Sequence, residues 1–266
     1  MIPNPIRRVL STLRSHRVRF LLMGGQACVF YGAAEFSRDT DILLLAETKN
    51  LDWLRRALDE LEAERIAVPA LTLACLRKGH GVHFRCRHPD ASGIRIDLLA
   101  VLRGMPPFRR LWERRTTVAM ADGGTVDLLS LPDLVRAKKT QRDKDWPMLR
   151  RLVEADYAQR GKRPNRRQVR FWLREARTAS LLVELAKRFP REAAQAMAGR
   201  PLLRYAREGN EDMLERALEE EAKTERLRDG EYWRPLIEEL ERIRHRETAR
   251  RHRVRARNSG ARHLGG

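Results

Sequence analysis

Residues 20–45, FLLMGGQACVFYGAAEFSRDTDILLL, constrain the fold of this chain more than any other stretch. An apolar run ends at Gly24 and Gly25, a stretch of helical character follows, and a second apolar run opens with Asp39 and Asp41. The pattern predicts a strand, a glycine turn, a helix and a strand with an acidic start. Because residues i and i+2 of a strand face the same side, both carboxylates point to one place. Such a pair can bind a divalent cation, although a solvated or capping pair has the same sequence.

Length and composition indicate a folded protein with a substantial core. At 266 residues, 42% of them hydrophobic, the chain is long enough for one large domain or two ordinary ones. Its three cysteines are unclustered, which favours a reducing compartment over a disulfide framework. Arginines interrupt the N-terminal segment, and no apolar run reaches membrane-spanning length. We therefore expect a soluble, cytoplasmic protein without a signal peptide or a membrane partner.

The charge is strongly positive. The net charge of +19 comes from 55 Lys and Arg against 36 Asp and Glu. This excess favours an anionic partner, for which nucleic acid and nucleotide fit best, and it predicts an association that weakens with salt. A GC-rich coding sequence, which favours arginine codons, would produce the same charge. The positive charge therefore supports contact with nucleic acid without establishing it.

The first part of the chain mixes helical and strand patterns. Helices are predicted over residues 4–16, 26–33, 51–65, 130–142 and 145–159, and strands over residues 19–23, 39–45, 82–87, 94–101, 116–119 and 125–128. The last four strands form two hairpins. Ser130, followed by Pro132 and Asp133, is a helix start signal.

The second part of the chain is predicted to be helical throughout. A Gly-Lys-Arg-Pro-Asn linker at residues 161–165 marks the predicted domain boundary. Helices are predicted over residues 165–176, 179–188, 191–198, 202–208, 210–225 and 231–246, with one of the breaks at Gly230. Residues 250–266 contain arginines and glycines but no acid, and we expect them to be disordered.

A third acid lies inside the predicted strand 94–101. Ile96 and Leu98 share one face of that strand, and Arg95 shares the other with Asp97. Asp97 is therefore a carboxylate on the polar face of a strand whose other face is apolar. On the preceding strand, His83 shares a face that would lie near it.

Together, Gly24 and Gly25, Asp39 and Asp41, and Asp97 resemble the three motifs of the nucleotidyltransferase superfamily with a DNA-polymerase-β-like catalytic fold. The resemblance is to the minimal branch that includes AbiEii-type toxins, and it covers residues 1 to about 155. The chain departs from the usual pattern at the residue between the paired acids, where a threonine replaces an apolar residue. The resemblance implies a catalytic domain with a mixed sheet flanked by helices in residues 1–160. Together with the helical domain in 165–249 and the disordered basic tail in 250–266, which the sequence patterns predict, it gives an α+β protein.

The resemblance also implies a two-metal site. Nucleotidyl transfer is an in-line displacement at phosphorus, and catalysis consists chiefly of positioning and of neutralising charge. Magnesium prefers carboxylate oxygens. Asp39 and Asp41 would hold the metal at the NTP triphosphate and share the second metal, and Asp97 would complete the second site and orient or deprotonate the attacking hydroxyl. Gly24 and Gly25 would let backbone N–H groups approach phosphate.

A basic segment at residues 137–145, AKKTQRDKD, extends the candidate site. Related nucleotidyltransferases have a lysine on such a helix, here Lys138 or Lys139, and a Lys-Asp pair after it, here Lys144 and Asp145. The lysine would pair with triphosphate and Asp145 would anchor it. Alternatively, Asp145 caps the next helix and the lysines are solvated. Arg38 would contact phosphate or balance the acidic pair.

The leading hypothesis is therefore a Mg²⁺-dependent nucleotidyltransferase that moves NMP from an NTP to an acceptor hydroxyl. Toxin-like relatives modify RNA, including tRNA 3′ ends, which implies RNA or tRNA and a cognate antitoxin as partners; other relatives modify proteins or small molecules. The basic region 165–250 would dock the anionic acceptor. The alternative is a catalytically degenerate module of the same fold that binds nucleic acid or a protein partner, and a phosphotransferase is a third option.

Overall fold

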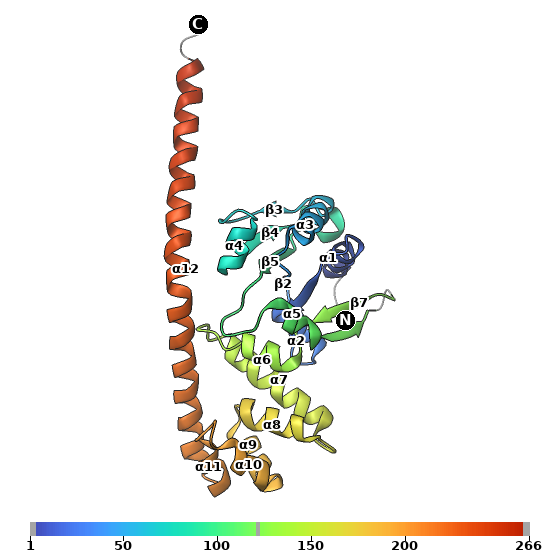
Figure 1. Ribbon diagram of the computed structural model, residues 1–266, viewed down its shortest axis with the longest axis vertical. Coiled ribbons are helices and arrows are strands. Elements are labelled where there is room, and N and C mark those ends of the chain that lie inside the picture. Colours follow the sequence, from blue (N-terminus) through green and yellow to red (C-terminus); the bar gives the residue numbers. More distant parts are fainter. Residues whose placement is uncertain (1–3, 121–122, 263–266) are drawn as a thin grey trace.

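The computed structural model describes residues 4–120 and 123–262, with side chains as far as residue 249. Figure 1 shows a sheet with helices around it, a group of helices below it and one long terminal helix alongside. The seven strands are β1 (Phe20–Met23), β2 (Asp39–Leu44), β3 (Glu64–Arg65), β4 (Val82–Arg85), β5 (Arg95–Leu99), β6 (Thr116–Ala119) and β7 (Thr125–Leu128). The predicted α+β class with a mixed sheet is confirmed.

The sheet has the strand order β3-β4-β5-β2-β1-β7-β6. β2 is antiparallel to β1 and parallel to β5, and β1 is parallel to β7. The pairs β3–β4, β4–β5 and β6–β7 are antiparallel, and the last two of these are the hairpins predicted from the sequence. A parallel pair requires a crossover connection, and the long segment between β2 and β5 provides it.

Alternate residues of the central strands enter two different cores. Leu22 and Ile42 pack on one face, together with buried side chains of α1 (Asn4–Ser15) and α3 (Thr48–Glu60). The opposite face carries Leu21 and Leu43, and it is covered by α2 (Gly24–Phe30), α5 (Phe108–Glu113), α6 (Leu131–Ala137) and α7 (Asp145–Arg160). Because the side-chain period of a strand is two, Asp39 and Asp41 lie on the same face as Leu43.

Several helix boundaries differ from the sequence prediction. α3 ends at Glu60 rather than at residue 65, because Glu62 adopts a left-handed conformation with φ of 47° and the chain then forms β3. α4 (Leu73–Lys78) was not predicted, although the Thr72 side chain caps it by accepting a hydrogen bond from the Cys75 backbone N–H at 3.2 Å. α5 was not predicted either, and α6 ends at Ala137 rather than near residue 142.

The C-terminal part of the chain is helical, as predicted. Its helices are α8 (Arg166–Glu175), α9 (Ala179–Arg188), α10 (Pro190–Ala196), α11 (Leu203–Glu208) and α12 (Glu211–Arg262). Residues 161–165 connect α7 to α8, and Trp172 of α8 is buried in the same hydrophobic cluster as Leu21 of β1. Packing is therefore continuous across this connection, and the division into two domains there stays a prediction.

α12 corrects two expectations. It runs through Gly230 without the predicted break, and through residues 250–262 of the tail that we expected to be disordered; residues 263–266 lie outside the described part. Asp229, which is 3% exposed, accepts hydrogen bonds from Arg103 Nε at 2.8 Å and from the Gln141 backbone N–H at 2.9 Å. These contacts help to offset the unfavourable helix propensity of Gly230, which is about 1 kcal/mol relative to alanine.

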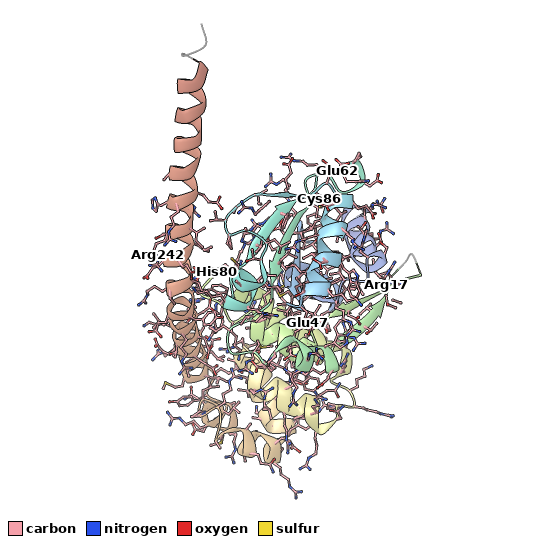
Figure 2. All side chains as sticks on the ribbon, turned by 45° about the horizontal axis from the view of Figure 1, so that its top comes forward. Arg17, Glu47, Glu62, His80, Cys86 and Arg242 are labelled. Atoms are coloured by element: carbon pink, nitrogen blue, oxygen red, sulfur yellow. The ribbon has the colours of Figure 1, made fainter. Side chains whose placement is uncertain are left out.

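Farther along, α12 lies beside the sheet domain. His80, which is 1% exposed, has its Nε2 atom 3.2 Å from Glu239 Oε2, and Figure 2 shows it on the side of the domain that faces α12. Lys78 Nζ lies 2.6 Å from the same oxygen, and Arg65 Nη1 lies 3.5 Å from Glu247 Oε1. Within the described residues, no helix combines the length and apolarity needed to cross a bilayer.

Asn50 of α3 joins the two central strands. Its side chain is buried, accepts a hydrogen bond from the Arg19 backbone N–H at 2.7 Å, and donates to the carbonyl oxygens of Arg19 at 3.0 Å and Leu45 at 2.9 Å. These three bonds satisfy backbone groups just before β1 and just after β2.

Asn50→Leu should therefore destabilise the protein. Because it leaves the Arg19 N–H without its partner and removes one of two hydrogen bonds at the carbonyl oxygens of Arg19 and Leu45, we expect the free energy of unfolding to fall by about 2 kcal/mol in urea denaturation. Gln159→Leu changes an exposed amide on α7 in the same way and should cost less than about 0.5 kcal/mol. Equal losses in the two variants would contradict the role of Asn50.

Candidate active site

The strand register brings two of the three predicted acids together. In the parallel pair of β2 and β5, Asp41 lies opposite Asp97 and Asp39 lies opposite Arg95. On its other side, Asp41 lies opposite Met23, the last residue of β1. Asp41 is therefore in the middle of the candidate site, whereas Asp39 is exposed at the start of β2.

Asp97 is held by two basic side chains. Its Oδ1 atom lies 2.6 Å from Arg95 Nε and 2.8 Å from His83 Nδ1. Burial by itself would raise the pKa of Asp97, but the hydrogen bonds and charges of His83 and Arg95 outweigh it, so its pKa lies below the usual range. Asp97 is therefore ionised at neutral pH.

Asp41 has the opposite electrostatic environment. Burial raises its pKa, and the negative charge of Asp97 raises it further. Two weaker influences oppose them: the positive charge of Lys138, and the Gly25 backbone N–H, which donates to Asp41 Oδ2 at 3.4 Å. Asp41 is thus a carboxylate whose negative charge is incompletely balanced by the surrounding protein.

The two glycines lie directly against this acidic cluster. They form the first turn of α2, whereas the sequence predicted a turn before a helix starting at residue 26. Gly24 has φ of +66°, and a Cβ atom there would lie 1.7 Å from Asp41 Oδ2. A Cβ atom on Gly25 would lie 2.3 Å from Ser37 Oγ. Only residues without a side chain let α2 begin this close to β2.

Lys138 and Asp145 form a second cluster near Asp41. Lys138 Nζ lies 3.0 Å from Asp145 Oδ1, while Asp145 Oδ2 accepts hydrogen bonds from Thr140 Oγ1 at 2.6 Å and Arg142 Nε at 2.8 Å. Burial would raise the pKa of Asp145, but the charge of Lys138 and these bonds lower it overall. Asp145 is the first residue of α7, and its side chain bonds the segment before that helix.

The other predicted site residues lie in different surroundings. Lys139 points away from the acids, with its Nζ atom 2.6 Å from Glu175 Oε2 of α8. Lys144 is exposed at the start of α7, and Arg38 is exposed beside Asp39. The structure thus gathers Gly24, Gly25, Asp41, Asp97, Lys138 and Asp145, and it places the remaining ones at the margin.

Arg95 and His83 are contacts of Asp97 that no motif identifies. The sequence places Arg95 two residues before Asp97 on the same strand face, which is a usable signal. The sequence also placed His83 on a strand face near Asp97, and the pairing of β4 with β5 puts the two residues directly opposite each other. The charge of Arg95 interacts with all three acids, most strongly with Asp97 and then with Asp39 and Asp41.

The donor chemistry of this cluster fits a hard divalent cation. Carboxylate oxygens are the ligands that Mg²⁺ prefers, and a nearby cation would favour the ionised form of Asp41, whose pKa burial and Asp97 raise. Among the side chains that the structure describes, no three His, Cys, Asp or Glu are arranged closely enough to form a metal site. Arg95 supplies the positive charge at Asp97 in this arrangement.

Neither a protein-family model nor a curated protein sequence matches this chain. The resemblance to nucleotidyltransferases therefore rests on the motif residues of the sequence alone.

The two acids should respond oppositely to neutralisation. The folded-state pKa of Asp41 is raised above its ordinary value of 3.8, so ionised Asp41 costs stability at neutral pH. Asp41→Asn should raise the free energy of unfolding by about 0.5–2 kcal/mol at pH 7, and the gain should vanish as the pH falls below 3.8.

Asp97→Asn is the matched control for that change. The folded-state pKa of Asp97 is lowered, so its stabilisation is present above the ordinary value of 3.8 and is lost as the pH falls toward the lowered pKa. The substitution should cost about 1.5–3 kcal/mol at pH 7 because charged hydrogen bonds are lost. Urea denaturation across pH 3 to pH 8 measures both variants, and effects of the same sign at pH 7 would contradict these environments.

Gly24→Ala should destabilise the protein through steric overlap with Asp41. We expect a loss of about 2 kcal/mol or more in thermal or urea unfolding. Gly93→Ala is the control, because Gly93 also has positive φ, +78°, but no atom lies within 4 Å of its added Cβ. Gly93→Ala should cost only about 1 kcal/mol, and equal losses would show that overlap at Gly24 is unimportant.

Proposed function

We propose that this protein is a Mg²⁺-dependent nucleotidyltransferase that transfers NMP from an NTP to an acceptor hydroxyl, with RNA as the acceptor. The observation that carries the proposal is the side-by-side placement of Asp41 and Asp97 on parallel strands, directly against the glycine turn at Gly24. Lys138, anchored by Asp145, supports it further because its charge reaches Asp41. The tRNA substrate and the cognate antitoxin that the sequence resemblance implies stay predictions.

Each residue has a defined task in this proposal. Bound Mg²⁺ would neutralise the triphosphate and acidify the attacking hydroxyl. Asp39 and Asp41 would hold the cation near the phosphates, and Lys138 would balance further phosphate charge. Asp97, ionised at neutral pH, would orient the acceptor hydroxyl and accept its proton as the hydroxyl oxygen attacks the α-phosphorus and pyrophosphate leaves.

One observation favours a second candidate function. Asp97 already pairs with Arg95 and His83, so the protein itself supplies positive charge where a metal would act. A catalytically degenerate module that binds nucleic acid or a protein partner would keep this arrangement permanently. In an active enzyme, the guanidinium of Arg95 would exchange Asp97 for the substrate phosphate or solvent.

The two candidates differ in metal-dependent nucleotide chemistry. Purified protein incubated with labelled NTPs, Mg²⁺ and total RNA should label RNA, and Asp41→Asn should reduce transfer by about 10³-fold because a carboxylate that would hold the cation is lost. Asp59→Asn, which removes an exposed carboxylate from α3, should leave transfer unchanged. Calorimetry should show Mg²⁺-dependent NTP binding that Asp41→Asn weakens.

A different outcome would support the degenerate module. If no NTP labels any acceptor and NTP binding needs neither Mg²⁺ nor Asp41, the enzymatic proposal is wrong.

A further inference from the structure

A strongly basic cleft lies on the helical side of the molecule, apart from the carboxylates. It has a volume of about 930 Å³ and is formed by the segment around Arg103 with α6, α8 and α12. Nine arginines and one lysine line it, against four acidic residues. None of Asp39, Asp41 and Asp97 is among the lining residues, so the cleft is a separate feature.

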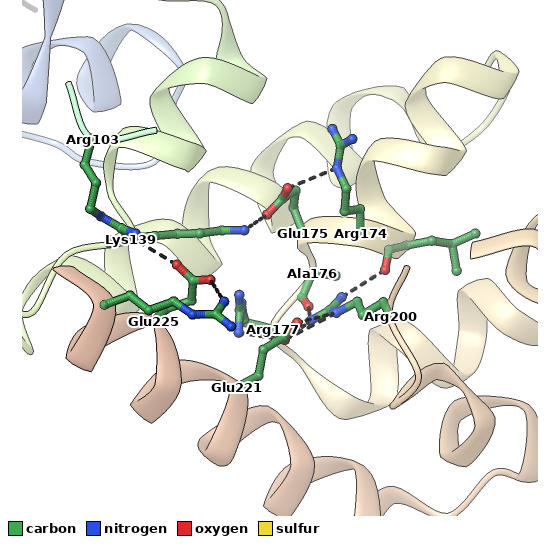
Figure 3. A network of polar contacts seen from close by, with 11 residues as sticks. Arg103, Lys139, Arg174, Glu175, Ala176, Arg177, Arg200, Glu221 and Glu225 are labelled. Carbon is green, nitrogen blue, oxygen red and sulfur yellow. Dashed lines mark hydrogen bonds and ion pairs between the residues drawn. The ribbon is translucent and has the colours of Figure 1, made fainter. Parts of the chain in front are cut away.

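The floor of this cleft is a network of ion pairs, shown in Figure 3. Lys139 Nζ lies 2.6 Å from Glu175 Oε2, and Arg103 Nη2 lies 3.2 Å from Glu225 Oε2. Arg200, which is 4% exposed, lies 2.8 Å from Glu221 Oε2 and also donates to two backbone carbonyls of the α8 end. These contacts join α6, α8 and α12 and fix the shape of the cleft.

Above this floor, three arginines lack an acidic partner among the described residues. They are Arg136 of α6 and Arg167 and Arg170 of α8, and all three are exposed. Free guanidinium groups on two facing elements leave an excess of positive charge inside one concavity. Such an arrangement raises the local concentration of anions and speeds their association.

The amphipathic character of α8 produces this surface. Its sequence RRQVRFWLRE buries Val169 and Trp172 against the core. Arg166, Arg170 and Arg174 recur every four residues, so they share one face of the helix, and that face lines the cleft. Among the described side chains, Arg166 lies 3.7 Å from Glu192 and Arg174 lies 3.1 Å from Glu175, so on this face Arg170 keeps its charge free for a ligand.

We propose that the cleft binds the phosphodiester backbone of a polynucleotide strand. Guanidinium groups bind phosphate oxygens in a planar, two-bond geometry, which explains why nearly all of the cations are arginine. A strand supplies one permanent charge per nucleotide, so it can engage the free arginines of α6 and α8 at once without breaking the ion pairs of the floor. The volume is at the upper end of small-ligand pockets, which leaves room for more than one nucleotide.

The position of the cleft relates it to the carboxylates. At the end of α6, Lys138 pairs with Asp145 near Asp41, and the next residue, Lys139, lines the cleft. The cleft and the candidate active site are therefore connected through the segment at the end of α6. As the holding site for an acceptor RNA, the cleft rests on the proposed function; as a polynucleotide site, it needs neither metal nor NTP.

The test is binding of a fluorescent single-stranded RNA to the full chain, measured by anisotropy without Mg²⁺ or NTP. The variant carries Arg136→Gln, Arg167→Gln and Arg170→Gln. At about 0.1 M salt we expect at least about tenfold weaker binding, and the slope of log K against log salt should fall by about 2, since each lost contact to a single strand contributes about 0.7.

The matched control carries Arg56→Gln, Arg151→Gln and Arg216→Gln. These residues are also exposed and free of acidic partners in the described part of the chain, and they lie on α3, α7 and α12 outside the cleft. The control has the same net charge as the cleft variant and should bind within about twofold of wild type. Thermal unfolding of both variants verifies that they are folded.

Several results would overturn the proposal. They are no binding by wild type, equal weakening in both triple variants, or displacement of RNA by poly-glutamate at equal charge concentration, which would indicate an acidic protein partner. Binding of single-stranded DNA of the same sequence, measured in the same way, shows whether the cleft prefers RNA or binds polynucleotides in general. Asp41→Asn should lower NMP transfer by about 10³-fold and leave RNA binding unchanged. If wild type binds RNA through the cleft but transfers no NMP, only the enzymatic proposal is refuted.

Discussion

The parallel pairing of β2 with β5 places two acidic side chains next to each other. The polar contacts around these strands compensate their negative charges. Asp41 and Asp97 are neighbours across the two strands, where partial burial makes their repulsion expensive. Basic side chains approach the two carboxylates from different directions: Arg95 from β5 itself, His83 from β4 and Lys138 from the end of α6. Three separate segments of the chain thus converge on two carboxylates.

These compensating contacts are unequal. Asp97 receives two direct hydrogen bonds, whereas Asp41 receives one long bond from a backbone N–H. The result is one carboxylate that the fold stabilises in its ionised form and one that the fold holds at a cost. Functional sites commonly retain such a cost, because a group that is fully satisfied inside the protein has little left to offer a ligand.

Local sequence patterns were sufficient for most of the elements and for the main positions of the site. Alternating and helical periodicity located β1, β2 and the hairpins, and the Asp-x-Asp spacing correctly put Asp39 and Asp41 on one face. Helix ends were harder, because α3 stops where Glu62 takes a left-handed conformation. The predicted hairpin also placed His83 near Asp97, and the register of β4 against β5 confirms it. What local patterns missed depends on partners distant in sequence, such as the passage of α12 through Gly230, next to which Asp229 accepts a hydrogen bond from Arg103.

The unbroken course of α12 has a mechanical consequence. One stretch of this helix supplies Glu225 to the ion pairs under the cleft, and a later stretch supplies Glu239 and Glu247 to side chains of the sheet domain. At 1.5 Å per residue, Glu225 and Glu247 are about 33 Å apart along the helix axis. A helix held at both places behaves as a strut, so a tilt of its lower end is carried to the far edge of the sheet.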